Sequence, residues 1–224
     1  MNLSVKTAIK GYKYRIYPTG GQKELINKTF GCSRFIYNHF LAMKIELYKT
    51  EQKSLSYNQC SELLTELKKE KEWLKEPDKC SLQNSLKDLD IAYQNFFRKI
   101  QKGNTNQGFP KFKSKKNNYK SYRTNFTNNN IEVDFEDNKI KLPKLKWIKC
   151  KIHRKFTGKI LSATISQVPS GKYYVSLNVE CEHEELPETN NSIGLDLGIS
   201  DLLITSNGKT FENNKLIYKY EKKL

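Results

Sequence analysis

The clearest pattern in the chain is an apolar stripe that starts after Ser81. Large apolar residues recur there at steps of three and four, which places them on one face of a helix: Leu82, Leu86, Leu89, Tyr93, Phe96, Phe97 and Ile100. Asp78 and Ser81 are candidate caps at its start. Similar spacing predicts a long helix upstream, in which a break near Gly31 stays open, and a third helix over 57–73. Residues 19–101 are therefore predicted to be mainly helical.

Two other regions alternate with the period of a strand. In residues 10–18, Tyr12, Tyr14 and Ile16 point one way and the intervening residues the other, and Pro18 ends the run. Short runs of the same kind fill residues 131–182, where Pro169-Ser170-Gly171 predicts a hairpin between the last two. Several strands this short predict a small barrel or sandwich. The predicted fold class is therefore α+β.

Asp196 lies inside an apolar run with a glycine on either side, Ile193–Gly198. A buried carboxylate is costly unless it is paired, and a divalent metal is one such partner. Downstream, Asn207-Gly208 predicts a type I′ hairpin. A strand with a central Asp followed by a hairpin is typical of the start of an RNase H-like domain. Actin-like and sugar-kinase folds open with the same pattern, and an Asp in a turn is the structural alternative.

Charge is the strongest feature of the composition. The net charge is +16, and two segments contain no carboxylate at all: residues 98–124 with nine Lys and Arg, and residues 138–179 with ten. A polyanion is the expected partner, with nucleic acid favoured over an anionic membrane. No apolar run approaches the roughly 20 residues that span a bilayer. The candidate contacts to a nucleic-acid backbone are Arg15, Lys111, Lys113, Lys115, Lys116, Lys120 and Arg123.

The segment 98–124 has the composition of a loop, rich in Gly, Asn and Pro. Its aromatic residues could stack on bases or pack locally: Phe109, Phe112, Tyr119 and Tyr122. A solvated loop without a ligand is the alternative.

A polar stripe accompanies the apolar one on the helix after Asp78. Lys79, Gln83 and Lys87 are spaced at i, i+4 and i+8. Gln can pair with adenine and Lys can reach guanine or phosphate, while an ordinary wet helix face is the alternative. The five cysteines show no C-x-x-C spacing and the three histidines are scattered, so reduced thiols and no zinc site are predicted.

Eight short sequence blocks along the chain, taken in order, resemble successive blocks of the TnpB (OrfB) proteins of insertion sequences, relatives of the type V CRISPR effectors. The resemblance covers nearly the whole chain, and the blocks are specific together rather than singly. They are YKYRIYPT, SRFIYNHFLA, LSYNQCSELLTELK, LQNSLKDLDIAYQNFFR, GFPKFKSKK, SYRTNFTNNNI, IKLPKLKWIK and IGLDLGISD.

The resemblance implies an architecture and partners. A helical recognition lobe, similar to a helix-turn-helix and carrying the basic loop, is inserted into a small wedge-like β-barrel, and the first strands of an RNase H-like (RuvC) domain follow. The partners implied are a guide RNA and double-stranded DNA beside a short adjacent motif, in the bacterial cytoplasm and nucleoid. The implied divisions are 1–18 (first barrel strand), 19–118 (lobe), 119–186 (rest of the barrel) and 191–224 (start of RuvC).

Site residues are implied as well. Tyr57, Ser61, Lys79, Gln83, Lys87 and Thr124 match positions that read or flank the DNA motif. Asp196 matches the first catalytic carboxylate, a ligand of Mg²⁺. The family's RuvC domain also needs a later Glu, a later Asp and a zinc ribbon, none of which is found in this sequence.

We therefore expect a truncated RNA-guided DNA endonuclease that cannot cleave, with Mg²⁺ bound only in a complete enzyme and Zn²⁺ only in the missing part. A nuclease-dead DNA-binding protein or RNA-guided transcriptional regulator is the alternative. The oligomeric state is not predicted.

Overall fold

A computed structural model describes residues 5–103, 108–116, 119–184 and 190–221. The chain divides into two compact units, a larger one of residues 5–183 and a smaller one from residue 184 onward. No helix in the described ranges is both long enough and apolar enough to cross a membrane.

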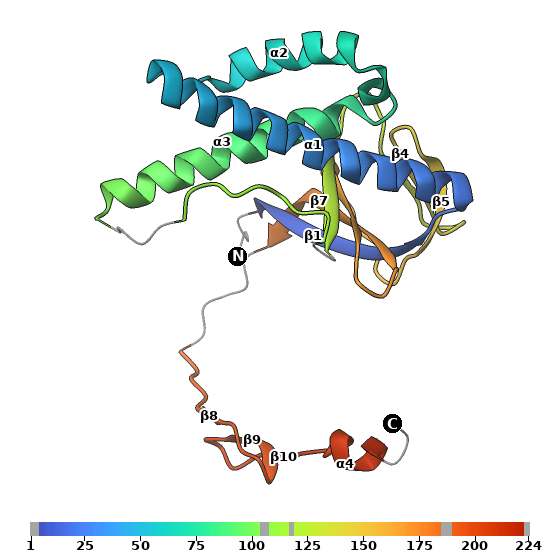
Figure 1. Ribbon diagram of the computed structural model, residues 1–224. Helices are drawn as coiled ribbons and strands as arrows, with labels where there is room; N and C mark the ends of the chain where they lie inside the picture. The colour runs from blue at the N-terminus through green and yellow to red at the C-terminus, as the bar shows by residue number, and fades with distance from the viewer. Residues whose placement is uncertain (1–4, 104–107, 117–118, 185–189, 222–224) are drawn as a thin grey trace. The chain divides into compact units, whose positions relative to one another are not determined.

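The larger unit contains a curled seven-stranded sheet (Figure 1). Its order is β2-β6-β7-β1-β5-β4-β3, and the ends of this order, β2 and β3, are not paired with each other within the described residues. The sheet is therefore a half-barrel, which corrects the predicted barrel, while the mixed helix-and-sheet fold is confirmed. The strands are β1 (Val5–Tyr17), β2 (Lys120–Asn125), β3 (Glu132–Asp134), β4 (Lys139–Leu142), β5 (Lys146–Lys151), β6 (Lys159–Gln167) and β7 (Tyr173–Glu184).

Three α-helices and a short 3-10 helix lie between β1 and β2: α1 (Gly20–Glu51), α2 (Tyr57–Glu70), η1 (Glu72–Lys75) and α3 (Lys79–Gln101). The long helix α1 runs through Gly31 without a break. Ser56 and Gln59 form a capping box at the start of α2, and Asp78 caps α3. Helix α3 ends at Gln101, as the predicted helical region 19–101 requires, and β2 begins at Lys120, inside the segment 98–124 that has the composition of a loop.

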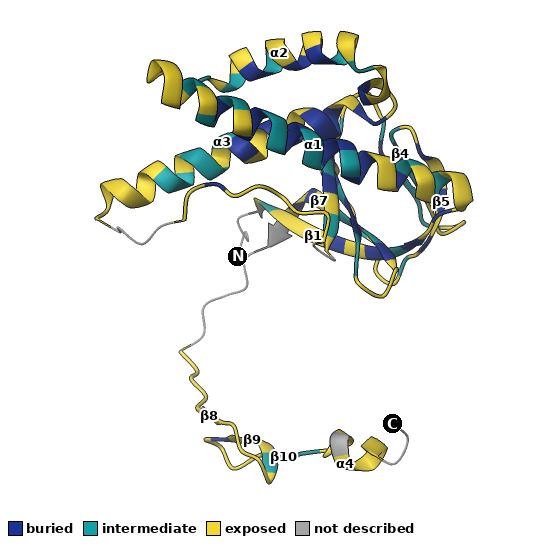
Figure 2. Cartoon of the chain, in the orientation of Figure 1, coloured by how far each residue is buried: buried dark blue, intermediate teal, exposed yellow. Residues whose placement is uncertain are grey.

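The apolar residues form two clusters, one on the sheet and one among the helices (Figure 2). Tyr12, Tyr14 and Ile16 of β1 are buried while Lys13 and Tyr17 are exposed, which confirms the predicted alternation. The first turns of α1 pack on the sheet cluster, and its later turns join Leu82, Leu86 and Leu89 of α3 in the helical cluster. Helix α1 thus belongs to both cores and joins helices to sheet.

The smaller unit has a three-stranded antiparallel sheet in the order β10-β9-β8, from β8 (Leu195–Asp196), β9 (Asp201–Thr205) and β10 (Thr210–Glu212), followed by α4 (Leu216–Tyr220). The hairpin between β9 and β10 is not the predicted type I′ turn. Only Gly208 (φ 82°) has a positive φ there, whereas type I′ needs two such residues. The Gly208 N–H donates to the Thr205 carbonyl at 2.9 Å, closing a three-residue loop with Gly in the left-handed position.

Candidate nucleic-acid interface

The start of α3 is fastened to the edge strand β2. A carboxylate oxygen of Asp78 accepts from the Ser81 N–H at 3.2 Å and from the Thr124 hydroxyl at 2.7 Å. One turn further on, the Asn84 amide donates to the Arg123 carbonyl at 2.9 Å. These bonds fix the position of the first turns of α3 relative to the sheet.

The predicted polar stripe lies exposed on this anchored helix. Lys79, Gln83 and Lys87 are all solvent-exposed, while the apolar residues beside them are buried. Tyr57 and Ser61 stand one turn apart on α2, which packs against α3, and both are partly exposed. Thr124 differs from these five: it is buried, and its hydroxyl is engaged by Asp78. Its structural role is to hold the N-cap of α3.

The basic segment 108–116 is held against α1 by a pair of hydrogen bonds between the Asn38 side chain and the Lys113 backbone. The Asn38 amide donates to the Lys113 carbonyl at 2.9 Å, and the Lys113 N–H donates to the Asn38 side-chain oxygen at 2.8 Å. The Lys113 ammonium lies 4.1 Å from the centre of the Tyr37 ring, and desolvation there lowers the pKa of Lys113. Lys111, Lys115 and Lys116 are exposed. This segment is thus docked through Lys113 and presents its other cations outward.

A second basic surface covers the outer face of the sheet. The register places Arg15 opposite Lys151, Tyr17 opposite Lys149, and Lys149 opposite Lys139, so these side chains share one face. Sequence reasoning singled out only Arg15 here. The absence of carboxylates from residues 138–179 indicated that Lys139, Lys149 and Lys151 could also bind an anion. The pairing of distant strands that brings them to one face cannot be predicted from that composition.

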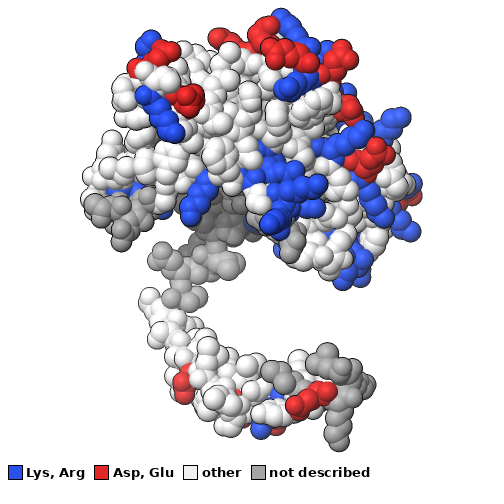
Figure 3. Space-filling model, viewed as in Figure 1, with Lys and Arg blue, Asp and Glu red and all other residues white. Residues whose placement is uncertain are grey.

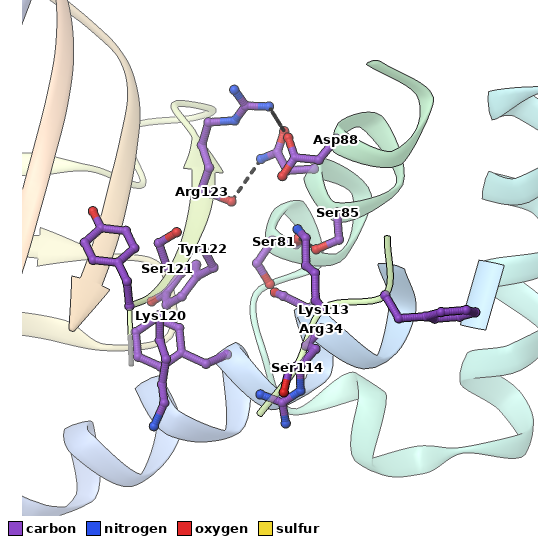
Figure 4. Close-up of a pocket in the computed structure, with 15 residues that line it drawn as sticks. Arg34, Ser81, Ser85, Asp88, Lys113, Ser114, Lys120, Ser121, Tyr122 and Arg123 are labelled. Atoms are coloured by element: carbon purple, nitrogen blue, oxygen red, sulfur yellow. Dashed lines mark hydrogen bonds and ion pairs between the residues drawn. The ribbon is translucent and has the colours of Figure 1, made fainter. Parts of the chain in front are cut away.

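A polar pocket of about 510 Å³ lies between α1, α3, β2 and the basic segment. Figure 4 shows the lining side chains from these elements, with Arg123 extended toward Asp88. Four of its lining residues are cations: Arg34, Lys113, Lys120 and Arg123. Asp88 is the carboxylate in the lining, and it pairs with Arg123 at 3.4 Å. The pocket therefore carries a net positive charge.

Two of the aromatic residues proposed as base-stacking candidates pack locally. The Phe109 ring meets Tyr93 and Phe96 edge-on, with centroids 5.5 Å and 5.4 Å away. Tyr122 is buried against Phe30 at 5.7 Å. Phe112 and Tyr119 are largely exposed. The local-packing alternative therefore holds for the buried Tyr122, whereas Phe109 has ring contacts but remains 43% exposed.

Seen from the side shown in Figure 3, Lys and Arg gather over the lower part of the larger unit, while most of the visible carboxylates lie along its top, near α2. This separation of charge agrees with the two carboxylate-free segments, one ending in β2 and the other running from β4 to β7. The larger unit thus presents a basic surface with its polar pocket and stripe.

Asp196 lies in β8, exposed, opposite Ile204 of β9. Asp201 of β9 pairs in register with Glu212 of β10, beside an irregularity in the pairing between Phe211 and Glu212. No three His, Cys, Asp or Glu side chains come together in the described residues in a way that could hold a metal ion. A two-metal site for phosphodiester cleavage needs several converging carboxylates, so the described residues do not fit one.

Comparison with known proteins places the chain in a family. An OrfB-type helix-turn-helix domain model matches residues 8–53, which form most of β1 and all of α1. The RNA-guided DNA endonuclease InsQ of Escherichia coli (strain K12) is 34% identical over 96% of this chain and 52% of its own length. An RNA-guided DNA endonuclease of Streptomyces pristinaespiralis is 32% identical over 92% of this chain and 50% of its own. The chain spans about half the length of these two relatives.

Two further matches are shorter or more remote. The virulence protein VsdF of Salmonella dublin is 34% identical over 48% of this chain and 94% of its own length. A chain from the cryo-EM structure of a Cas12f1–sgRNA–target DNA complex is 12% identical, with a TM-score of 0.39 over 96% of this chain and 59% of that one, which is too low to carry an argument. The family model and the two long matches together show that the chain belongs to the TnpB (OrfB) family.

Proposed function

We propose that residues 5–183 are the part of an RNA-guided DNA endonuclease that binds guide RNA and target DNA. The observation that carries the proposal is the position of the α3 stripe beside the cation-lined pocket: Gln83 and Asn84 are neighbours on one helix, the first exposed and the second lining the pocket. Side chains that reach base edges need nearby phosphate contacts to fix their register on the duplex. The names of the two long relatives point to the same activity.

Within this proposal, the stripe reads a short motif in double-stranded DNA beside the target. Gln83 offers a donor and an acceptor to one base edge, and Lys79 and Lys87 supply neighbouring cations. Tyr57 and Ser61 would contact the same DNA from α2, and Thr124 would act indirectly, through Asp78 and the position of α3. The basic segment and the outer face of the sheet are left to hold RNA and DNA backbones.

Asp196 is our candidate for the first Mg²⁺ ligand of the nuclease domain, in which bound Mg²⁺ would stabilise the charge of an in-line phosphodiester displacement. Since the described residues gather no further ligands around it, we propose that this chain alone does not cut DNA. Plasmid cleavage with guide RNA and Mg²⁺, beside an Asp196→Ala control, tests this. Guide-dependent cutting that the control abolishes would contradict it.

The motif-reading role is tested by selection from a DNA library randomised beside the target. Gln83→Ala should lose about 1–3 kcal/mol of discrimination at one base position. Gln94→Ala is the matched control, because Gln94 is exposed on the same helix and its amide donates to the Asp90 carboxylate at 2.7 Å. If Gln83→Ala keeps the preference of the unaltered chain, Gln83 does not read the motif. If the unaltered chain itself selects no preferred bases from the library, it does not recognise an adjacent motif.

A further inference from the structure

Two residues that line the cation-rich pocket each carry a buried polar atom that has no hydrogen-bond partner among the described residues. These atoms are the Ser33 hydroxyl oxygen and the Nε of Arg123. Ser33 is only 7% exposed, so its hydroxyl is nine-tenths withdrawn from solvent. Buried polar groups are nearly always paired, because an unpaired one loses its bonds to water and regains nothing. Two such donors in one pocket indicate a missing acceptor.

The neighbours of these two donors show that the lack of a partner is specific. Thr29, one turn earlier on α1, donates its hydroxyl to the Leu25 carbonyl at 2.7 Å, which is the usual solution for a hydroxyl inside a helix. Ser33 has no such bond. Among the described residues, the hydrogen bonds of the Arg123 guanidinium involve one terminal nitrogen, which lies 3.4 Å from Asp88 and 3.5 Å from the Asn84 oxygen. Its Nε–H is left for another acceptor.

The charge of the pocket identifies that acceptor as an anion. Arg34, Lys113 and Lys120 line it together with Arg123, and the Asp88 carboxylate is occupied by Arg123. Ser81, in the first turn of α3, also lines it. Several donors around one anion suit a group with several oxygens, and guanidinium and hydroxyl donors match phosphate.

We propose that this pocket binds one phosphodiester of a nucleic-acid strand, held by Ser33 and Arg123. The inference rests on the proposed function and adds a defined phosphate site to it. A strand is favoured over a free phosphate because the pocket adjoins both the α3 stripe and the basic segment, so a strand whose phosphate sits there can continue along further cations. The bound phosphate would set the register of the bases presented to Gln83.

The test measures the affinity of the full chain for labelled DNA and RNA strands and a DNA duplex, over a range of salt concentration. Ser33→Ala should weaken binding about tenfold, the size of one hydrogen bond to a charged group. It should not lower the thermal unfolding midpoint, because the hydroxyl it removes has no partner in the free protein. Arg123→Gln should weaken binding at least as much and reduce the slope of log affinity against log salt by about 0.7–0.9.

Two matched variants serve as controls. Thr29→Val removes a buried hydroxyl of α1 that already has a partner, and Lys69→Gln removes one positive charge from α2, where Lys69 pairs with Glu66. Both should bind within about twofold of the unaltered chain. A last experiment adds inorganic phosphate and measures the change in the thermal unfolding midpoint of the unaltered full chain and of Ser33→Ala.

Four outcomes would overturn the proposal. The first is strand affinity unchanged in both Ser33→Ala and Arg123→Gln. The second is an equal loss in the controls. The third is that Ser33→Ala abolishes stabilisation by inorganic phosphate but leaves strand affinity unchanged, which would assign the pocket to a free phosphate. The fourth is no binding of any strand by the unaltered chain, which removes the proposed function as well, whereas the first three leave it standing.

Discussion

The two units contain strands of similar apolar character but of very different burial. In the larger unit Val175 and Leu177 of β7 are fully buried, whereas Leu195 of β8 and Leu202 of β9 in the smaller unit are 61% and 53% exposed. In the first case a helix and neighbouring strands pack on the apolar side chains. Within the smaller unit, no described residue covers them. An apolar pattern therefore specifies that a strand forms, and separate parts of the chain decide whether it is covered.

The carboxylates of the two units differ in the same way. Asp78 is buried and accepts two hydrogen bonds that fasten α3 to β2. Asp196 is exposed on a three-stranded sheet. The difference between the two carboxylates follows from their surroundings, because a buried Asp needs hydrogen-bond partners, while an exposed Asp is solvated by water. The contribution of a carboxylate to the free energy of unfolding thus depends on the unit in which it lies, and substitutions in both units test this difference.

The largest expected effect comes from placing a charge in each type of strand. Val175→Asp would bury an unpaired charge and should lower the free energy of unfolding by about 3–5 kcal/mol or prevent folding. Leu195→Asp in β8 should change it by less than about 0.5 kcal/mol, because the side chain is already in water. Denaturant unfolding followed by circular dichroism compares them. Equal destabilisation by both variants would mean that the smaller unit has a cover that the comparison overlooks.

The second comparison concerns the two carboxylates. Asp78→Ala removes the N-cap of α3 and leaves the Thr124 hydroxyl buried without its acceptor, so it should cost about 2–3 kcal/mol of unfolding free energy. Asp196→Ala should be neutral within about 0.5 kcal/mol. Thr124→Val tests the cause, since it should recover part of the loss in the double variant with Asp78→Ala. If Asp78→Ala is also neutral, Asp78 does not fasten α3 to the sheet.

The smallest effect is a pH dependence within the helical part of the larger unit. Burial, together with the charge of Lys71, lowers the pKa of His39 in the folded chain. The unfolded chain then binds a proton more readily, so stability is complete above the ordinary histidine pKa of about 6.5 and is lost as pH falls below it. The loss should be less than about 1 kcal/mol, because the ring is partly solvated. His39→Gln should flatten this pH slope, and an unchanged slope would assign it elsewhere.

Much of the fold could be predicted because its signals are local. The alternation in β1, the i, i+3, i+4 spacing of α3 and the Asp78 cap each lie within one element and were read correctly. Gly31 was a weak signal for a break, and tertiary packing of α1 on two cores overrides it. The open sheet could not be read, because closure depends on pairing between strands distant in sequence.

The candidate site was predicted in part for the same reason. The α3 stripe is a helical repeat and was found from spacing alone. Ser33 and Asn38 were missed, since a serine or asparagine in a helix has no distinctive pattern until another segment packs against it. The burial of Thr124 was also hidden, because the residue that binds its hydroxyl lies on another element.

The central claim is that the chain binds nucleic acid through backbone phosphates, and the salt dependence of binding tests it most directly. The affinity of the full chain for DNA and RNA of unrelated sequence should fall linearly on a log–log plot as salt rises, with a slope of about 0.7–0.9 for each phosphate contacted. Reversing exposed Lys111, Lys115 and Lys116 to Glu should lower affinity for all sequences alike and make the slope shallower. A slope near zero, or affinity that the reversal leaves unchanged, would contradict the account.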